Sequence, residues 1–315
     1  AYVKASNTGS VDSFGFSVAL SDNTLVVGAV NEASLARGID GDQNNDDSLG
    51  SGAVYVFTRE AGVWAQQAYI KASNSDLGDN FGVSVTISED LIAVGASSEG
   101  SASLGVDGNQ DDNSGTKYGA VYVFARSDGQ WSQEAYLKSS NGCRTFAESV
   151  SLSNETLAVG CVGEDSAAIG VDGDQSDTSA QSSGAVYVFT RNDGQWSQEA
   201  YLKASNTDSG DLFGSSVCLS GDLLAVGAER ESSIAVGVNG PEDNNSAPNS
   251  GAAYVFVRKG GIWSQELYLK PTNTDASDEF GGSVAVSNGT VVVGAVFEDG
   301  VNSESLGSGA AYLLR

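Results

Sequence analysis

The sequence predicts an all-β protein, a five-bladed β-propeller of four-stranded antiparallel blades, and three observations support this. An internal repeat places Phe14, Phe81, Phe146, Phe213 and Phe280 at spacings of 67, 65, 67 and 67 residues. Each repeat holds four short runs rich in Val, Tyr, Phe and Trp, separated by Gly, Asn, Asp and Ser, a pattern typical of strands. The two ends of the chain, finally, carry complementary parts of one repeat.

In the first repeat we expect strands over residues 14–21, 24–29, 52–57 and 64–71. The first and second strands are joined by only a few residues, and so are the third and fourth. Such short connections force antiparallel hairpins. The run at 52–57, "GAVYVF", is apolar on both alternating sets of side chains. A sheet that is apolar on both faces must be covered on both, and the radial stacking of blades achieves this.

The chain ends predict closure of the ring. The last repeat stops at Arg315, which aligns with Arg59 at the end of the third strand, so its fourth strand is missing. The first residues, Ala1-Tyr2-Val3-Lys4, align with Ala68-Tyr69-Ile70-Lys71 inside a fourth strand. We therefore expect residues 1–7 to supply the outer strand of the last blade, and residues 1–315 to form a single domain without a long free sheet edge.

The charge balance limits the classes of molecule that the chain is expected to bind. There are 41 acidic residues against 15 basic ones, a formal net charge of −26. Nucleic acids and anionic membranes would be repelled, because their binding depends on Lys and Arg. Metal cations, basic proteins and neutral sugars remain as partners. No apolar run approaches 18 residues, so no transmembrane segment is expected.

Phe-Gly pairs begin the repeats at residues 14–15, 81–82, 213–214 and 280–281, and Gly-Ala pairs follow at 28–29, 95–96, 227–228 and 294–295. This combination resembles the FG-GAP repeat, which builds the propeller of integrin α chains and related secreted arrays. The recurring segment W-S-Q-x-x-Y-L-K looks like the non-integrin branch. The resemblance implies a propeller fold and leaves the function open.

Three departures limit what the resemblance implies. The third repeat reads Phe146-Ala147 and Gly160-Cys161, and the proline of the family name is replaced in every repeat. Integrin-type repeats carry their calcium loop between the first two strands. Here that connection is three or four residues long, so no integrin metal ligand is transferred. The long acidic loop lies between the second and third strands instead.

Acidic residues concentrate at one end of the predicted blades. The loops between the second and third strands, together with the crossings between repeats, hold 29 of the 41 acids. Alternate carboxylates around a glycine turn suit hard cations, and calcium takes six to eight oxygens. We therefore predict calcium sites in the first four loops, from Asp40, Asp42, Asp46 and Asp47; Asp107, Asn109, Asp111 and Asp112; Asp172, Asp174 and Asp177; and Asn239, Glu242 and Asp243.

The same loops have a second interpretation. Asp, Asn, Ser and Gly form solvated loops with Asx turns, and the glutamate that closes an EF-hand is absent. The apolar residues Ile39, Val106, Val171 and Val238 suggest that the loops fold back onto their blades. Both interpretations, metal binding and a solvated ordered loop, remain open.

Three cysteines allow one disulfide. Cys143 and Cys161 stand at positions that other repeats keep small, at the same end of two neighbouring strands, so we predict a disulfide between them and an oxidising compartment. Cys218 is expected to be a buried thiol. The recurring Trp64, Trp131, Trp196 and Trp263 are interpreted as wedges between blades, with sugar stacking as the alternative.

The chain has no histidine, which removes the usual general base and His-ligated zinc. We expect a non-enzymatic, extracellular binding or adhesion module, secreted or at the cell surface, with a protein or glycan ligand on its acidic, calcium-binding loop face. One alternative is a structural building block of a matrix, sheath or filament that self-associates. Another is a carbohydrate-acting enzyme that uses paired carboxylates.

Overall fold

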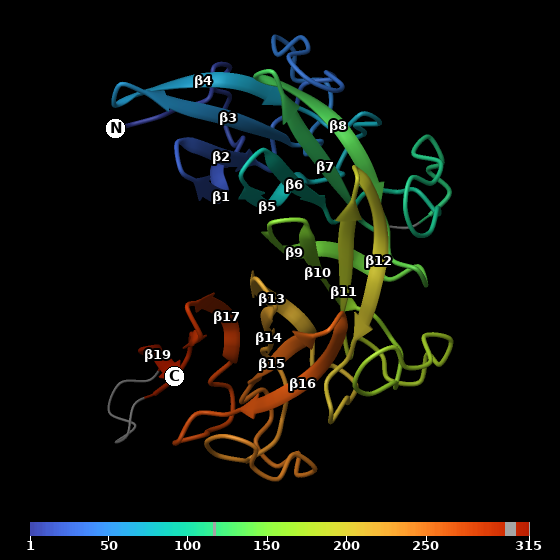
Figure 1. The fold of residues 1–315 in the computed structure, drawn as a ribbon, viewed down its shortest axis with the longest axis vertical. Helices are drawn as coiled ribbons and strands as arrows, with labels where there is room; N and C mark the ends of the chain where they lie inside the picture. Colours follow the sequence, from blue (N-terminus) through green and yellow to red (C-terminus); the bar gives the residue numbers. More distant parts are fainter. Residues whose placement is uncertain (116–117, 300–306, 315) are drawn as a thin grey trace. The chain divides into compact units, whose positions relative to one another are not determined.

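The computed structural model describes residues 1–115, 118–299 and 307–314. Its strands form five antiparallel sheets, each of three or four strands, as expected for a five-bladed propeller, and no helix occurs among these residues (Figure 1). The sheets follow one another in sequence order. The first is β1 (Phe14–Ser21), β2 (Thr24–Ala29), β3 (Ala53–Glu60) and β4 (Val63–Ile70), and the second is β5 (Phe81–Ser88), β6 (Leu91–Ala96), β7 (Ala120–Ser127) and β8 (Gln130–Leu137).

The remaining sheets repeat this order. The third is β9 (Arg144–Ser153), β10 (Thr156–Gly163), β11 (Ala185–Asn192) and β12 (Gln195–Leu202), and the fourth is β13 (Phe213–Ser220), β14 (Leu223–Ala228), β15 (Ala252–Lys259) and β16 (Ile262–Leu269). The fifth has three strands among the described residues, β17 (Phe280–Ser287), β18 (Thr290–Ala295) and β19 (Ala310–Leu314).

The predicted fourth strand of the fifth sheet is not confirmed. Residues 1–4 are in no strand, and β19 pairs with β18 alone among the described residues. Residues 6 and 7 instead contact the first repeat: the Ser6 hydroxyl donates to Gln43, and the Asn7 amide donates to Glu32. Closure of the ring by an N-terminal strand stays a prediction of the sequence.

The chain divides into two compact units, with the boundary inside the third sheet. One unit comprises Ala1–Glu155 and Arg191–Ser197, the other Thr156–Thr190 and Gln198–Arg315. Within each unit, consecutive sheets are stacked face to face. In the first unit, Val85 and Ile87 of β5 join Val26, Val54 and Val56 in one apolar cluster. In the second unit, Val286 of β17 packs with residues of β14 and β15. The prediction of one domain over residues 1–315 stays a prediction.

The Gly of each motif permits a close approach between stacked sheets. Gly82, at a φ of 89°, directs its carbonyl at Gly28 of β2, where a Cβ would lie 2.2 Å from that oxygen. The Ser17 hydroxyl donates to the same carbonyl at 2.7 Å. A side chain at Gly28 would collide with this carbonyl, whereas a side chain at Gly82 would have to accept a strained positive φ, as Ala147 does in the third repeat.

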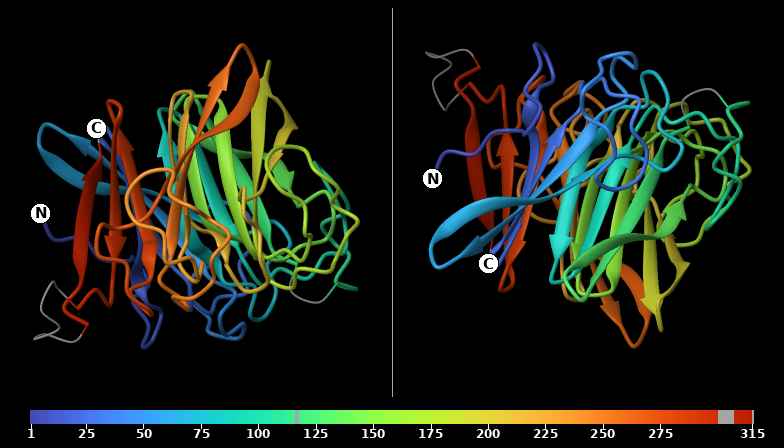
Figure 2. Two further views of the ribbon diagram at one scale, coloured as in Figure 1. Left: turned by 90° about the horizontal axis from the view of Figure 1, so that it is seen from below. Right: turned by 90° about the horizontal axis from the view of Figure 1, so that it is seen from above.

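Short turns and long loops leave opposite ends of the sheets. Two-residue turns close the β1–β2 and β5–β6 hairpins, since Ser21 pairs with Thr24 and Ser88 with Leu91. The segments over 30–52 and 97–115 leave the other end of the first two sheets, as Figure 2 shows. The antiparallel order thus gathers the acidic segments of this unit at one end, which we call the loop face.

Candidate functional site

The first oxygen-bearing residue of each predicted metal set has a structural role. Asp40 accepts the Tyr69 N–H at 2.9 Å through its carboxylate, and its own N–H donates to the Tyr69 carbonyl at 2.7 Å. Asp107, Asp172 and Asn239 make the same pair of contacts with Tyr136, Tyr201 and Tyr268. These residues fasten the loops to the outer strands.

The apolar residue beside each of them confirms that the loops fold back. Isolated antiparallel bridges join the loops to β4, β8, β12 and β16 at Ile39–Ile70, Val106–Leu137, Val171–Leu202 and Val238–Leu269. Each loop therefore adds a short stretch of backbone pairing to the edge of its sheet.

The other predicted ligands form exposed turns. Asp42, Asn109 and Asp174 each accept the N–H two residues ahead, the Asx turn of the second interpretation. Asp112 and Asp177 do the same with Ser114 and Ser179. The Ser176 hydroxyl and N–H hold the pKa of Asp174 below its ordinary value. Asp46, Asp47, Asp111 and Asp243 are exposed.

Glu242, another predicted calcium ligand, bonds to the segment that precedes its sheet. It accepts the Ser205 hydroxyl, and its carbonyl accepts the Asn206 amide at 3.5 Å. Gln110 stands in the same place in the second repeat, where it accepts Ser73 and the Gln133 amide, the latter at 3.2 Å. The residue at this position, Glu242 or Gln110, thus bonds the long loop to the segment that precedes the first strand of the same sheet.

In the described residues, no three Asp, Glu, His or Cys side chains converge as a metal-binding group would. The loops are ordered by backbone bridges, caps and Gln or Glu locks. Calcium binding stays a prediction, and the side chains would have to leave their Asx turns to provide the required oxygens.

A set of buried glutamates was missed by the sequence interpretation, which counted them with the solvated acids. In the second repeat Glu99 is fully buried and pairs with the ammonium of Lys138 at 2.7 Å. The Tyr136 hydroxyl donates to it at 2.8 Å, and the Asn74 amide donates at 3.0 Å. Burial lowers the pKa of Lys138, and Glu99 opposes that shift.

This buried centre recurs. The pairs Glu32–Lys71, Glu164–Lys203 and Glu231–Lys270 have N–O distances of 2.8 Å, and Glu298 is buried with Asn273 and Tyr312. These lysines are therefore buried counter-charges and not solvated cations. A signal was present in the sequence, since a glutamate follows the reference phenylalanine by 18 residues in all five repeats.

Aspartates form a second group of buried acidic residues. Asp79 and Asp211 each accept the N–H three residues before them, from Asp76 and Asp208. Burial raises the pKa of both carboxyls to about 7, and a nearby glutamate adds to the rise. Of the 29 acids counted in the loops and crossings, nine are buried among the described residues: Asp12, Glu32, Asp79, Glu99, Glu164, Asp211, Glu231, Asp278 and Glu298.

Trp131 and Trp196 contact neighbouring sheets, as the packing interpretation predicts. Trp131 is 7 % exposed, and its N–H donates to Gln67 of β4 at 3.0 Å. The Arg126 guanidinium lies 5.0 Å from the centroid of the Trp131 ring, within cation–π range. Trp196 donates to Glu134 of β8 in the same manner.

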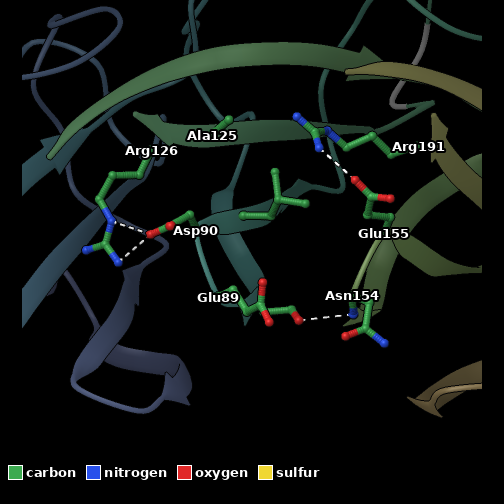
Figure 3. Close-up of a pocket in the computed structure, with 9 residues that line it drawn as sticks. Glu89, Asp90, Ala125, Arg126, Asn154, Glu155 and Arg191 are labelled. Carbon is green, nitrogen blue, oxygen red and sulfur yellow. Dashed lines mark hydrogen bonds and ion pairs between the residues drawn. The ribbon is translucent and has the colours of Figure 1, made fainter. Parts of the chain in front are cut away.

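A pocket of about 480 Å³ opens at the hairpin-turn end of the first unit (Figure 3). Arg126 points to Asp90 at 2.7 Å and Arg191 points to Glu155 at 2.8 Å. Arg191 also binds Glu134 at 2.7 Å. Because both of its arginines are already paired with carboxylates, we interpret this pocket as a brace between sheets.

The third repeat differs from the others. Cys143 and Cys161 form the predicted disulfide. Ala147 replaces the glycine of the repeat but keeps a φ of 76°. Arg144 stands where the other repeats have a buried aspartate. Cys218 of β13 is a free thiol that packs against an apolar cluster but is only partly buried, so the expected burial is incomplete.

The family profile described as "FG-GAP repeat" matches residues 1–57, 64–124, 196–256 and 263–314. The unmatched stretch holds most of the divergent third repeat. No curated protein sequence matches the chain. No helix among the described residues is long and apolar enough to cross a membrane. The profile covers well over half of the sequence, and the sheets repeat with it, so the chain belongs to the FG-GAP repeat family.

Proposed function

We propose that the chain is a non-enzymatic, extracellular binding or adhesion module, and that its loop face receives a basic segment of a partner protein. One observation carries the proposal: the acids of the long loops divide into buried, paired residues and exposed residues held on ordered turns. Asp42, Asp174 and Asp177 belong to the exposed group.

Ordered loops favour binding because less conformational entropy is lost on association. The caps at Asp40 and Asp107 and the locks at Gln43 and Gln110 hold the loops before any partner arrives. A fixed array of carboxylates also accelerates the approach of a cationic partner through long-range attraction.

The extracellular location is supported by the Cys143–Cys161 disulfide, since such bonds persist mainly in oxidising compartments. The absence of histidine from the sequence supports a binding role over general-base catalysis. A structural building block is the second candidate. Calcium-dependent self-association of the isolated chain would favour it.

A matched pair of triple variants tests the proposal. Asp42→Asn, Asp46→Asn and Asp47→Asn neutralise one loop, whereas Asp22→Asn, Asp128→Asn and Asp193→Asn neutralise three exposed hairpin turns. Both sets change the net charge equally. Surface plasmon resonance with an immobilised decalysine peptide should show slower association and a shallower salt dependence only for the loop variant. Equal losses in the two variants would leave net charge alone as the cause and refute the proposal.

Calcium binding is a separate proposal on the same loops. It is supported by the alternate oxygens of Asp172, Asp174 and Asp177. Because Asp174 and Asp177 must give up their turns, we expect a dissociation constant in the range of about 10⁻⁴–10⁻³ M. Calorimetric titration should detect it, and neither heat nor a thermal shift at millimolar calcium would contradict it.

A further inference from the structure

A second pocket of about 780 Å³ lies on the loop face of the first unit. We call it the Leu77 pocket. It is lined by Asp76, Leu77, Asp79, Asn113 and Arg144, together with small residues of the crossing and of the loop that follows β6. Its volume falls within the range of small-molecule sites in proteins.

The charges in the Leu77 pocket nearly balance, unlike those of the surrounding loop face. Asp76 is 3.4 Å from the guanidinium of Arg37 and accepts the Asn113 amide at 2.5 Å. Asp79 is buried, and burial raises the pKa of its carboxyl to about 7, so it carries less than a full charge at neutral pH. Arg144 adds a positive charge to the lining. The balance disfavours both a strong cation and a strong anion.

The lining combines planar polar groups with one apolar surface. A carboxylate, an amide and a guanidinium each present two polar atoms in a plane, which suits adjacent hydroxyls that both donate and accept. Leu77 is 70 % exposed and offers an apolar surface that an uncharged ring could cover. No leucine occurs at the aligned positions of the first, fourth and fifth repeats, which hold Ser10, Ser209 and Ala276.

We propose that the Leu77 pocket binds a neutral saccharide, with the ring packed on Leu77 and its hydroxyls bonded to Asp76, Asn113 and Arg144. This inference rests on the proposed binding role and names a class of ligand for one part of the loop face. It concerns a site that the other repeats do not reproduce, because they also have Asp in place of Arg144.

Two substitutions replace pocket residues with the residues found at the aligned positions of other repeats. Leu77→Ser copies Ser10 and Ser209, and Arg144→Asp copies Asp79 and Asp211. Leu77→Ser replaces an exposed side chain, so it should fold even where Arg144→Asp disturbs the neighbouring disulfide. The control is Leu35→Ser, which removes another exposed leucine, 57 % exposed, from a different loop of the same unit.

The full-length chain is first tested on an array of neutral oligosaccharides derived from β-glucan, xylan, galactan and chitin. The best binder is then titrated by calorimetry. We expect binding that is insensitive to salt, a loss of at least roughly tenfold in affinity for Leu77→Ser and Arg144→Asp, and no change for Leu35→Ser. No binding to any glycan at millimolar concentration, or equal binding by Leu77→Ser and the parent chain, would overturn the inference.

The decalysine measurement separates this inference from the proposed function. If glycans do not bind while decalysine still does, the saccharide site is refuted and the basic-partner proposal stands. If Leu77→Ser weakens decalysine binding but leaves glycan binding unchanged, the pocket takes a basic side chain instead of a sugar, which also refutes the inference.

Discussion

Glu99 and Asp111 lie twelve residues apart in one loop, yet their surroundings are opposite. Glu99 is fully buried, with Lys138, Tyr136 and Asn74 around it. Asp111 is exposed on an Asx turn whose acceptor is Asn109. The comparison teaches that net charge describes this molecule poorly, because some acids hold the loop in place and others face the solvent.

The largest expected effect comes from breaking a buried pair. Glu99→Gln leaves the Lys138 ammonium buried without its counter-charge, and we expect a loss of about 3–5 kcal/mol in the free energy of unfolding. Asp111→Asn should change it by less than about 0.5 kcal/mol. Urea denaturation of both variants measures the difference, and similar losses would remove the distinction between the two groups of acids.

The disulfide should have the next largest effect. Replacing both Cys143 and Cys161 with Ala frees the segment between them in the unfolded chain, at a cost of about 3 kcal/mol. Cys218→Ala should cost less, since Cys218 is a free thiol. Thermal denaturation with and without a reductant provides the check: a parent chain that is unaffected by reduction would argue against a stabilising bond.

The buried aspartates should make stability depend on pH. The folded pKa of Asp79, about 7, lies above its unfolded value of 3.8, so its contribution is greatest below pH 4 and is lost as pH rises through 7. Asp79→Asn keeps an acceptor for the Asp76 N–H without the buried charge. The variant should exceed the parent chain in unfolding free energy at pH 8 by about 1–2 kcal/mol and match it near pH 4. The reverse order at pH 8 would contradict this account.

The smallest expected effect concerns the third repeat. Ala147 has a φ of 76°, which a Cβ makes unfavourable. Ala147→Gly restores the residue of the other four repeats and should stabilise the chain by about 0.5–1 kcal/mol, because the strain removed exceeds the added freedom of the unfolded chain. A matched Ala158→Gly substitution in β10 should instead destabilise it.

Much of the fold follows from the sequence because its determinants are local and repeated. The phenylalanine spacing, the short turns and the doubly apolar third strand predict the sheets, and Ile39 and its counterparts predict the folded-back loops. The burial of Glu32 and Asp79 was not predicted, because composition reports charge and not depth. A glutamate at a constant position in otherwise variable loops, matched by a lysine at the end of each outer strand, was the available signal.

The acidic pattern did not reveal the structural roles of its first residues. Asp40 and Asp107, each the first residue of a predicted metal set, also cap the backbone of an outer strand, a role that depends on the register between loop and strand. Likewise the Leu77 pocket combines a crossing, a loop and the first residues of β9. Such combinations depend on tertiary packing, which residue spacing alone does not reveal.

The central claim is that the chain's own hydrogen bonds order the acidic loops, and amide hydrogen exchange in the presence of a calcium chelator tests it most directly. The Asp40 N–H donates to Tyr69 and the Asp107 N–H to Tyr136, each at 2.7 Å. We predict that both amides exchange slowly in the chelator and that added calcium changes their rates little. Rapid exchange that becomes slow only when calcium is added would contradict the account, because the metal would then be what orders the loops.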